Sequence, residues 1–289
     1  MQTKHSQLAK AQQFQAMHFR KEMLLLPNIW DPLGALLLQN IGYPAVATAS
    51  ASIAFSNGYN DGEQIPFTEL VWQVTKITDS VDIPVSVDIE SGYSNSIDGI
   101  QKNIHKLIHA GIIGVNIEDT NKTNNSLVPI MIQCEKIQAI REVGARMGVP
   151  IFINTRTDVY LNDSPHITNV EKFKKLLKRA HAYKAAGADC IFPIGLKNKN
   201  EIEKFVNELS CPVNILMLPD VPDLITLQQI GVSRVSFGPS FLKVAIKALK
   251  DTALNIKNLA NIDSITQNEI KTDYLKKLVI KKHKNEHHI

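Results

Sequence analysis

The chain has 289 residues, of which 44% are hydrophobic and 21% are charged, and its formal net charge at pH 7 is +4. This composition is that of an ordinary globular protein, long enough for one large α/β domain. Part of the positive charge sits in a C-terminal run, Lys281-Lys282-His283-Lys284, so we expect a solvated basic tail and no binding to nucleic acid.

Membrane contact and export are not indicated. No apolar run is long enough to span a bilayer, and residues 1–6 lack the apolar core of a signal peptide. Cys134, Cys190 and Cys211 are widely spaced and form no C-x-x-C pair, which argues against a zinc ribbon or a disulfide framework. We therefore expect a cytoplasmic protein.

A Gln- and Lys-rich stretch over residues 4–22 predicts an N-terminal helix. After it, short apolar runs alternate eight times with helix-like segments. The runs predict strands at 23–29, 45–49, 84–89, 113–117, 150–155, 188–194, 212–218 and 234–237. The segments between them predict helices at 32–40, 67–79, 96–110, 131–147, 169–186, 200–209, 221–230 and 239–249, with further helix at 255–260 and 274–280.

The alternation predicts an α/β fold, specifically a (β/α)₈ TIM-type barrel. The strands are continuously apolar, as in a parallel sheet that is buried on both faces. Four helices end just before a glycine, at Gly42, Gly111, Gly187 and Gly231, which suits a left-handed closing residue. A doubly wound open sheet is the rival, but no G-x-G-x-x-G follows the first strand. We expect an N-terminal helix at 1–22, the barrel at 23–250, and a C-terminal helical extension with the basic tail at 251–289.

Two acids end the third predicted strand. Asp88 and Glu90 are one residue apart, so a strand would point both side chains the same way. Buried acids on one face are costly unless a positive charge accompanies them, and Mg²⁺ held by oxygen ligands would supply it. The alternative is that these acids cap the next helix or face water.

Further polar residues fall where other strands end, which is where such barrels place catalytic groups. Glu118 follows the fourth strand, Asp61 lies on the second loop, and Arg156 follows the fifth strand. An acidic cleft with one arginine suits a metal and a substrate that carries carboxylate or phosphate. The alternative for Arg156 is an ion pair with Asp158 or Glu118. Lys122, in the loop after the fourth strand, either reaches the site or is solvated.

These pieces together resemble the isocitrate lyase/phosphoenolpyruvate mutase superfamily, in particular its phosphonomutase-like branch, over roughly residues 20–250. The segments that carry the resemblance are 26–31, 58–63, 87–93, 116–119 and 154–158. The resemblance implies a modified (β/α)₈ barrel whose eighth helix is exchanged between subunits, and hence a homodimer or homotetramer.

The resemblance also implies roles for individual residues. It implies a Mg²⁺ site, with Mn²⁺ as the alternative ion, formed by Asp88, Glu90 and Glu118. It implies catalytic roles for Asp61, Glu118, Lys122 and Arg156, and substrate binding by Trp30, Ala49, Ser50, Arg156 and Asn214. The backbone N–H groups at Ala49 and Ser50 would bind the carboxylate of a 2-oxo acid.

The loop after the fourth strand departs from the best-known lyases of that superfamily. Isocitrate and methylisocitrate lyases carry K-[KR]-C-G-H there, whereas residues 118–129 contain no cysteine or histidine, and Ile194 replaces a glutamate. The resemblance thus implies a Mg²⁺-dependent lyase other than isocitrate lyase. It would cleave a C–C bond in a small 2-oxo or hydroxy carboxylate through a pyruvate-like enolate. Tyr59, Lys122 or metal-bound water would be its acid or base.

Two alternatives stay open. One is a mutase or hydrolase that acts on the C–P bond of a phosphonate or on phosphoenolpyruvate. The other is a non-catalytic binder of 2-oxo acids.

Overall fold

The structure is a computed structural model, and it describes residues 4–161 and 167–280. The basic run at 281–284 lies outside the described residues. The strands are β1 (Leu24–Leu26), β2 (Asn28–Ile29), β3 (Val46–Thr48), β4 (Val85–Asp88), β5 (Gly114–Glu118), β6 (Phe152–Thr157), β7 (Cys190–Pro193), β8 (Asn214–Leu216) and β9 (Arg234–Ser236). The helices are α1 (Lys4–Met17), α2 (Pro32–Ile41), α3 (Ser50–Ser56), α4 (Phe67–Ser80), α5 (Ile97–His109), α6 (Ile130–Met147), α7 (Asn169–Ala185), α8 (Lys199–Leu209), α9 (Leu224–Gln229), α10 (Ser240–Lys257), α11 (Asp263–Thr266) and α12 (Thr272–Ile280).

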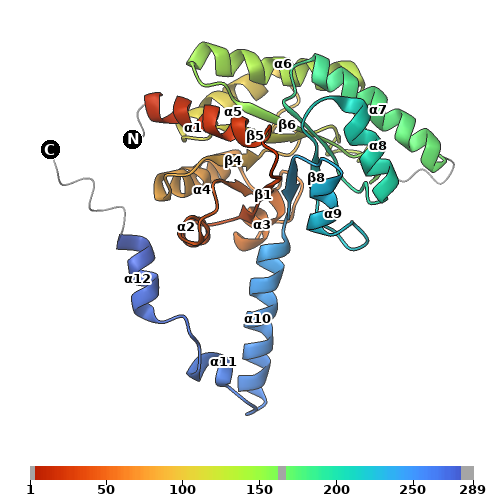
Figure 1. The fold of residues 1–289 in the computed structure, drawn as a ribbon. Helices are drawn as coiled ribbons and strands as arrows, with labels where there is room; N and C mark the ends of the chain where they lie inside the picture. Colours follow the sequence, from red (N-terminus) through yellow and green to blue (C-terminus); the bar gives the residue numbers. More distant parts are fainter. Residues whose placement is uncertain (1–3, 162–166, 281–289) are drawn as a thin grey trace.

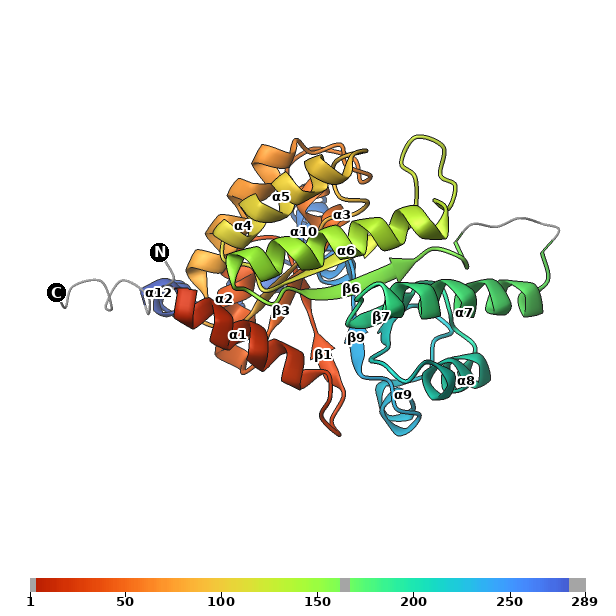
Figure 2. The same cartoon turned by 90° about the horizontal axis from the view of Figure 1, so that it is seen from above.

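All strand pairs are parallel, and together they close a ring. One sheet has the order β2-β3-β4-β5-β6-β7 and the other has the order β1-β9-β8. Pro27 joins β1 to β2 in the chain, and a parallel bridge between Ile191 and Val213 joins β7 to the start of β8. The ring of strands with helices around it (Figures 1 and 2) confirms the predicted (β/α)₈ barrel.

The first strand is interrupted, whereas we predicted one strand over 23–29. Pro27 has no N–H to give to a ladder, so the segment changes partner there. β1 pairs with β9 before the proline, and β2 pairs with β3 after it.

The N-terminal helix α1 packs against one end of the barrel. Phe14 on α1 meets Phe152 of β6 edge to face, at 5.2 Å between ring centroids. Gln7 donates through its amide to the carbonyl oxygens of Ile108 and Ile112, which precede β5. α1 therefore covers the N-terminal ends of β5 and β6 and leaves the opposite end of the barrel free.

Other elements differ in extent from the prediction. α3 lies between the predicted strand at 45–49 and the predicted helix at 67–79, where we predicted no helix. α10 runs to Lys257, past the predicted end at 249 and through residue 250, where we expected the barrel domain to end. The predicted helix at 255–260 is in fact the end of α10 and a turn.

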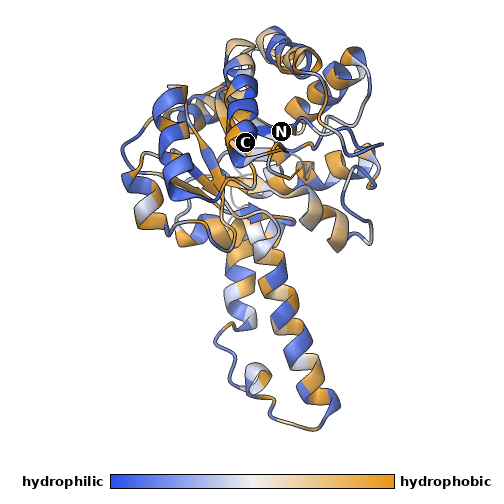
Figure 3. Ribbon diagram, turned by 90° about the vertical axis from the view of Figure 1, so that its right-hand side faces the viewer, coloured by the Kyte–Doolittle hydropathy of each residue, from blue (hydrophilic) through white to orange (hydrophobic). Residues whose placement is uncertain are grey.

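α10 leaves the barrel instead of packing along it (Figures 1 and 3). It exposes apolar side chains, among them Val244 (72% exposed) and Leu249 (66% exposed). α12 runs back toward the barrel and contacts α2, where Leu278 is buried. Among the described residues, no helix has the length and apolar character that a bilayer crossing requires.

Candidate active site

A cavity of about 240 Å³ opens at the C-terminal ends of the strands. Its lining includes Asp61 and Asp88, the arginines Arg156 and Arg234, and the helix start at Ser50. Strand ends at this face of a TIM-type barrel carry the catalytic groups, and a cavity of this size suits a small acid.

Asp88 ends β4 and presents a carboxylate to this cavity. Its Oδ1 accepts from the Asn116 side-chain amide at 2.9 Å and from the Glu90 N–H at 3.3 Å, and its Oδ2 accepts from the Ser50 N–H at 3.1 Å. Thr48 orients the strand by accepting the Asp88 N–H at 3.0 Å. These bonds fix the carboxylate, while no ion pair to it is formed within 4–161 and 167–280. Its negative charge is therefore available to a cation.

Glu90 lies beyond the strand, in the left-handed region with φ 50°. Strand alternation, from which we predicted that Asp88 and Glu90 point the same way, therefore does not apply to Glu90. The Oε1 of Glu90 accepts from the Glu63 N–H at 2.8 Å and from the Tyr93 hydroxyl at 3.3 Å. Its Oε2 lies 2.7 Å from the ammonium of Lys122. Burial raises the pKa of Glu90, and Lys122 opposes that rise.

Lys122 lies on the loop between β5 and α6 and extends to the two buried acids Glu90 and Glu118. The loop is held as a narrow hairpin by an antiparallel bridge between Thr120 and Leu127. The Lys122 ammonium contacts both Glu90 and Glu118. Burial alone would lower the pKa of Lys122, but these two carboxylates together raise it above its ordinary value. Lys122 thus contacts two buried acids instead of being fully solvated, but Lys122, Glu90 and Glu118 are not among the residues that line the Asp88 cavity.

Glu118 is 1% exposed at the end of β5. Besides Lys122, it contacts Arg156, whose Nη1 lies 2.9 Å from its Oε2. Burial raises the pKa of Glu118 to about 7, and the two neighbouring cations oppose the rise.

Arg156 forms both of the ion pairs that we considered as its alternative role. Its Nε and Nη2 donate to the two carboxylate oxygens of Asp158 at 2.6 and 3.0 Å, and Nη1 pairs with Glu118. Both acids raise the pKa of Arg156 against the effect of burial. The guanidinium lines the cavity but is already engaged by protein carboxylates.

The three expected metal ligands are not equivalent. Within the described residues no group of three His, Cys, Asp or Glu side chains is close enough to hold a metal ion. Lys122 bridges Glu90 and Glu118, whereas Asp88 faces the cavity without a cation. A hard cation that is held by one carboxylate and completed by water and substrate is a common Mg²⁺ arrangement, so Asp88 fits as its protein ligand.

The expected substrate-binding residues fall into two groups. Ala49 and Ser50 line the cavity, and the Ser50 N–H donates to Asp88. Trp30 and Asn214 are not among the residues that line it. The Trp30 carbonyl accepts from Gln73 at 2.8 Å, and Asn214 is buried inside the barrel, where its Oδ1 accepts from the Ser236 hydroxyl at 3.1 Å.

Tyr59, one of the candidates for the general acid or base, makes its hydrogen bond outside the cavity. Its hydroxyl donates to Glu69 at 3.0 Å, and it is not part of the cavity lining.

Sequence reasoning missed a buried network behind the site. Asp119, which is fully buried, accepts from the Tyr183 hydroxyl at 2.7 Å and from Arg179 at 3.0 Å, both on α7. It also accepts from the hydroxyl of Thr157 at 2.7 Å and from the Asp158 N–H at 2.9 Å. This network anchors the ends of β5 and β6. Asp119 directly follows Glu118, and that adjacency of two acids was the signal available.

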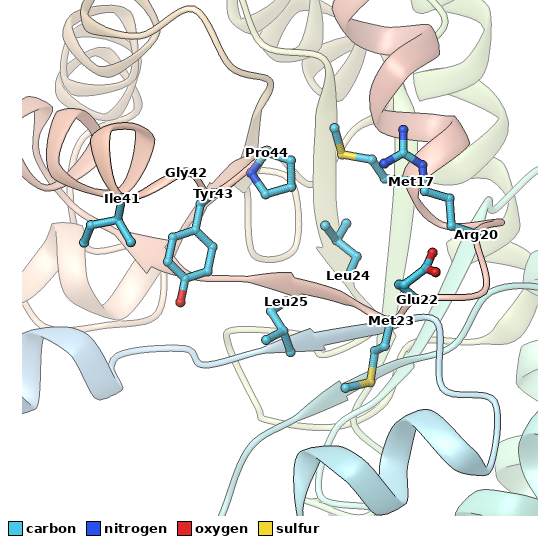
Figure 4. Close-up of a pocket in the computed structure, with 10 residues that line it drawn as sticks. All are labelled: Met17, Arg20, Glu22, Met23, Leu24, Leu25, Ile41, Gly42, Tyr43 and Pro44. Atoms are coloured by element: carbon cyan, nitrogen blue, oxygen red, sulfur yellow. The ribbon is translucent and has the colours of Figure 1, made fainter.

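A second cavity of about 520 Å³ lies at the N-terminal end of β1 (Figure 4). Met23, Leu24 and Leu25 of this segment and Ile41 to Pro44 line it, with Arg20 and Glu22 at one side. It is larger than the Asp88 cavity, but it lies at the opposite end of the strands and brings no group of acids together. The candidate active site is therefore the Asp88 cavity.

Comparisons with known proteins show the family to which the chain belongs. The family model for phosphoenolpyruvate phosphomutase matches residues 14–257. The chain belongs to this family. Family members share the barrel, and a solved structure from Burkholderia cenocepacia J2315, provisionally named a phosphonomutase, superposes with a TM-score of 0.80. It is 36% identical, and the match covers 84% of this chain and 98% of that one.

Two named relatives are lyases by description. A 2-methylisocitrate lyase of Aeropyrum pernix is 29% identical, with 79% of this chain and 74% of the relative covered. Oxaloacetate decarboxylase 1 of Pseudomonas putida is 27% identical, with 78% and 76% covered. The phosphoenolpyruvate phosphomutase family thus includes lyases as well as phosphomutases, and its members support an enzyme of this superfamily.

Proposed function

We propose that this protein is a Mg²⁺-dependent lyase that cleaves a C–C bond in a small 2-oxo or hydroxy carboxylate. The observation that carries the proposal is the Asp88 carboxylate, which faces the cavity at the C-terminal ends of the strands and forms no ion pair with any residue that the structure describes. The lyase relatives, which match more than two thirds of this chain, support the same reaction class.

Mg²⁺, or Mn²⁺ in its place, would be held at Asp88 and would stabilise negative charge as it develops on the substrate's oxo group. The chain itself supplies the framework for this chemistry. Asn116 and the Ser50 N–H hold the Asp88 carboxylate in one orientation. Glu118, whose pKa lies near neutrality, is paired with Lys122, and this pair would hold and release a proton for the reaction.

The loop that carries Lys122 would also exclude water. Lys122 ties this loop to Glu90 and Glu118, both of which belong to the barrel mouth. If this loop closed over the cavity when substrate binds, it would protect a reactive carbanion-like species from unwanted protonation.

A C–P mutase or hydrolase is the second candidate. The family model describes a phosphomutase, and the Burkholderia cenocepacia structure, at 36% identity, bears the provisional name phosphonomutase. The cavity's arginines would serve a phosphoryl group as well as a carboxylate.

We infer that the functional unit is a homodimer or homotetramer in which α10 is exchanged between subunits. The exposed apolar side chains of the projecting α10 support this proposal, since a face of this kind is normally covered. The three cysteines are free, which supports a reducing, cytoplasmic location.

The reaction is tested by incubating the protein with oxaloacetate, 2-methylmalate, isocitrate and phosphonopyruvate, with Mg²⁺ or with EDTA. Pyruvate, glyoxylate, CO₂, phosphoenolpyruvate and phosphate are then measured. Mg²⁺-dependent release from a carboxylic acid is the expected result. Turnover of phosphonopyruvate alone would replace the lyase by the C–P candidate. Thermal stabilisation by oxo acids without any turnover would contradict both and indicate a binder.

A further inference from the structure

Arg234 is a buried arginine without an acidic partner. It is the first residue of β9 and is 2% exposed. Its Nε donates to the Ser236 hydroxyl at 3.1 Å, and its Nη1 has no hydrogen-bond partner. Across the described residues, its guanidinium forms no ion pair with a carboxylate. This differs from Arg156, which pairs with Asp158 and Glu118.

The surroundings of Arg234 do not neutralise it. Two other titratable side chains influence it from inside the barrel, His18 and Cys190, and Asp88 acts on it from the cavity wall. Burial holds His18 neutral and raises the pKa of the Cys190 thiol, so neither is an anion at neutral pH. Burial lowers the pKa of Arg234 only to about 10, so the guanidinium keeps its charge. An unpaired buried charge is strongly unfavourable, which implies that an anion completes the arrangement.

A second donor lies beside it. Asn214 on β8 is directly opposite Arg234 in the parallel ladder. Its Oδ1 accepts from the Ser236 hydroxyl, which itself accepts from Arg234, and its buried Nδ2 has no partner. The unpartnered groups of this pair are therefore both donors. Arg234 and Ser236 also line the Asp88 cavity, so a ligand in that cavity can reach Arg234.

We propose that Arg234 forms an oxyanion-binding subsite at the inner end of the cavity, which takes a second carboxylate of the substrate, and that Asn214 positions it through the Ser236 hydroxyl. The inference rests on the proposed function and narrows its substrate class to dicarboxylates. One end of the acid is bound near Asp88, and the other accepts hydrogen bonds from the Arg234 guanidinium. Arg234 is then a specificity-determining residue.

The test compares acids that differ only by one carboxylate. Binding of malate and 2-hydroxybutanoate, and of 2-oxoglutarate and 2-oxopentanoate, is measured by calorimetry in the presence of Mg²⁺. The wild type is expected to prefer the dicarboxylate of at least one pair by about tenfold or more, as charged hydrogen bonds provide. Arg234→Met and Arg234→Gln should reduce that preference to about threefold or less, with monocarboxylate affinity nearly unchanged. Arg146→Met, on the exposed face of α6, is the matched control and should keep the preference.

The melting temperature without ligand separates this role from a structural one. Removing a buried charge that has no partner should leave the melting temperature of Arg234→Met unchanged or raise it. An undiminished preference in both variants, or failure of both to fold, would overturn the inference while leaving Mg²⁺-dependent turnover by the wild type intact. A wild type that binds none of these acids and turns over none of the reaction panel would overturn the inference and the proposed function together.

Discussion

His18 illustrates how strongly the barrel interior acts on one side chain. It lies just after α1, is almost fully buried, and stacks on Phe152 with 4.0 Å between ring centroids. One ring nitrogen, Nδ1, bonds to the Phe14 carbonyl at 2.8 Å, and Nε2 has no hydrogen-bond partner among the described residues. Burial, assisted by the charge of Arg234, lowers the pKa of His18 to about 3. The folded protein therefore keeps this imidazole neutral where an unfolded chain would protonate it.

This shift predicts a loss of stability in acid. The pKa of the folded state is below that of the unfolded state, so the unfolded chain binds the additional proton as the pH falls from about 6.5 toward 3. Between pH 6.5 and 5 this residue should remove about 2 kcal/mol from the free energy of unfolding. Urea unfolding at both pH values should show a smaller difference in His18→Phe than in the wild type. Equal pH dependence in the two proteins would contradict the assignment.

Other features at the residue scale were only partly visible in the sequence. The position of a residue at a strand end predicted the neighbourhood of Asp88, Glu118 and Arg156, because parallel strands bring their ends together. The ion pairs that these acids form were not predictable, since they depend on how far the Lys122 side chain extends from its loop. Arg234 was missed because a charge at the start of a short strand gives no sign that it points into the barrel.

The elements themselves followed the sequence closely. The apolar runs became strands and the amphipathic segments became helices, with Gly42, Gly111, Gly187 and Gly231 all at positive φ as expected. The misses have physical causes. α3 lacks an amphipathic pattern long enough to detect, and β1 and β2 part at Pro27, whose effect on strand pairing depends on neighbours far away in the sequence.

At the scale of elements, the turn after β4 carries a testable constraint. Gly92 has φ 112°, and a Cβ there would lie 3.1 Å from the Ile100 side chain. Gly92→Ala should cost about 1–2 kcal/mol of stability and lower activity, because the turn also carries Glu90. Gly42→Ala is the control, since its φ of 104° is similar but a Cβ there meets nothing within 4 Å. Denaturant unfolding and turnover rates measure both effects, and equal activity losses in the two variants would argue against the turn's role in the site.

The whole molecule is defined by a barrel from which α10 projects. A TIM-type barrel normally covers its strands with a ring of helices, whereas α10 extends away and leaves Val244 and Leu249 in the open (Figure 1). The Lys- and Ala-containing sequence of α10 predicted a helix but gave no direction for it. Only the tertiary arrangement reveals that its apolar face needs a cover.

This arrangement predicts an oligomer in solution. Light scattering after size exclusion should give a dimer or tetramer for the wild type. Val244→Glu combined with Leu249→Lys should shift the mass toward the monomer, because charges on a buried apolar face are costly. Lys250→Gln, an exposed polar change on the same helix, is the control. A monomeric wild type, or a double variant of unchanged mass, would contradict the proposed exchange.

Divalent-metal binding tests the central claim most directly. Binding of Mn²⁺ is measured by electron paramagnetic resonance for the wild type, for Asp88→Asn, and for Asp82→Asn, which alters an exposed acid just ahead of the same strand. The account predicts one Mn²⁺ per chain, with affinity reduced by about 100-fold or more in Asp88→Asn and unchanged in Asp82→Asn. Full Mn²⁺ affinity in Asp88→Asn would contradict the claim that this carboxylate is the metal-binding centre of the site.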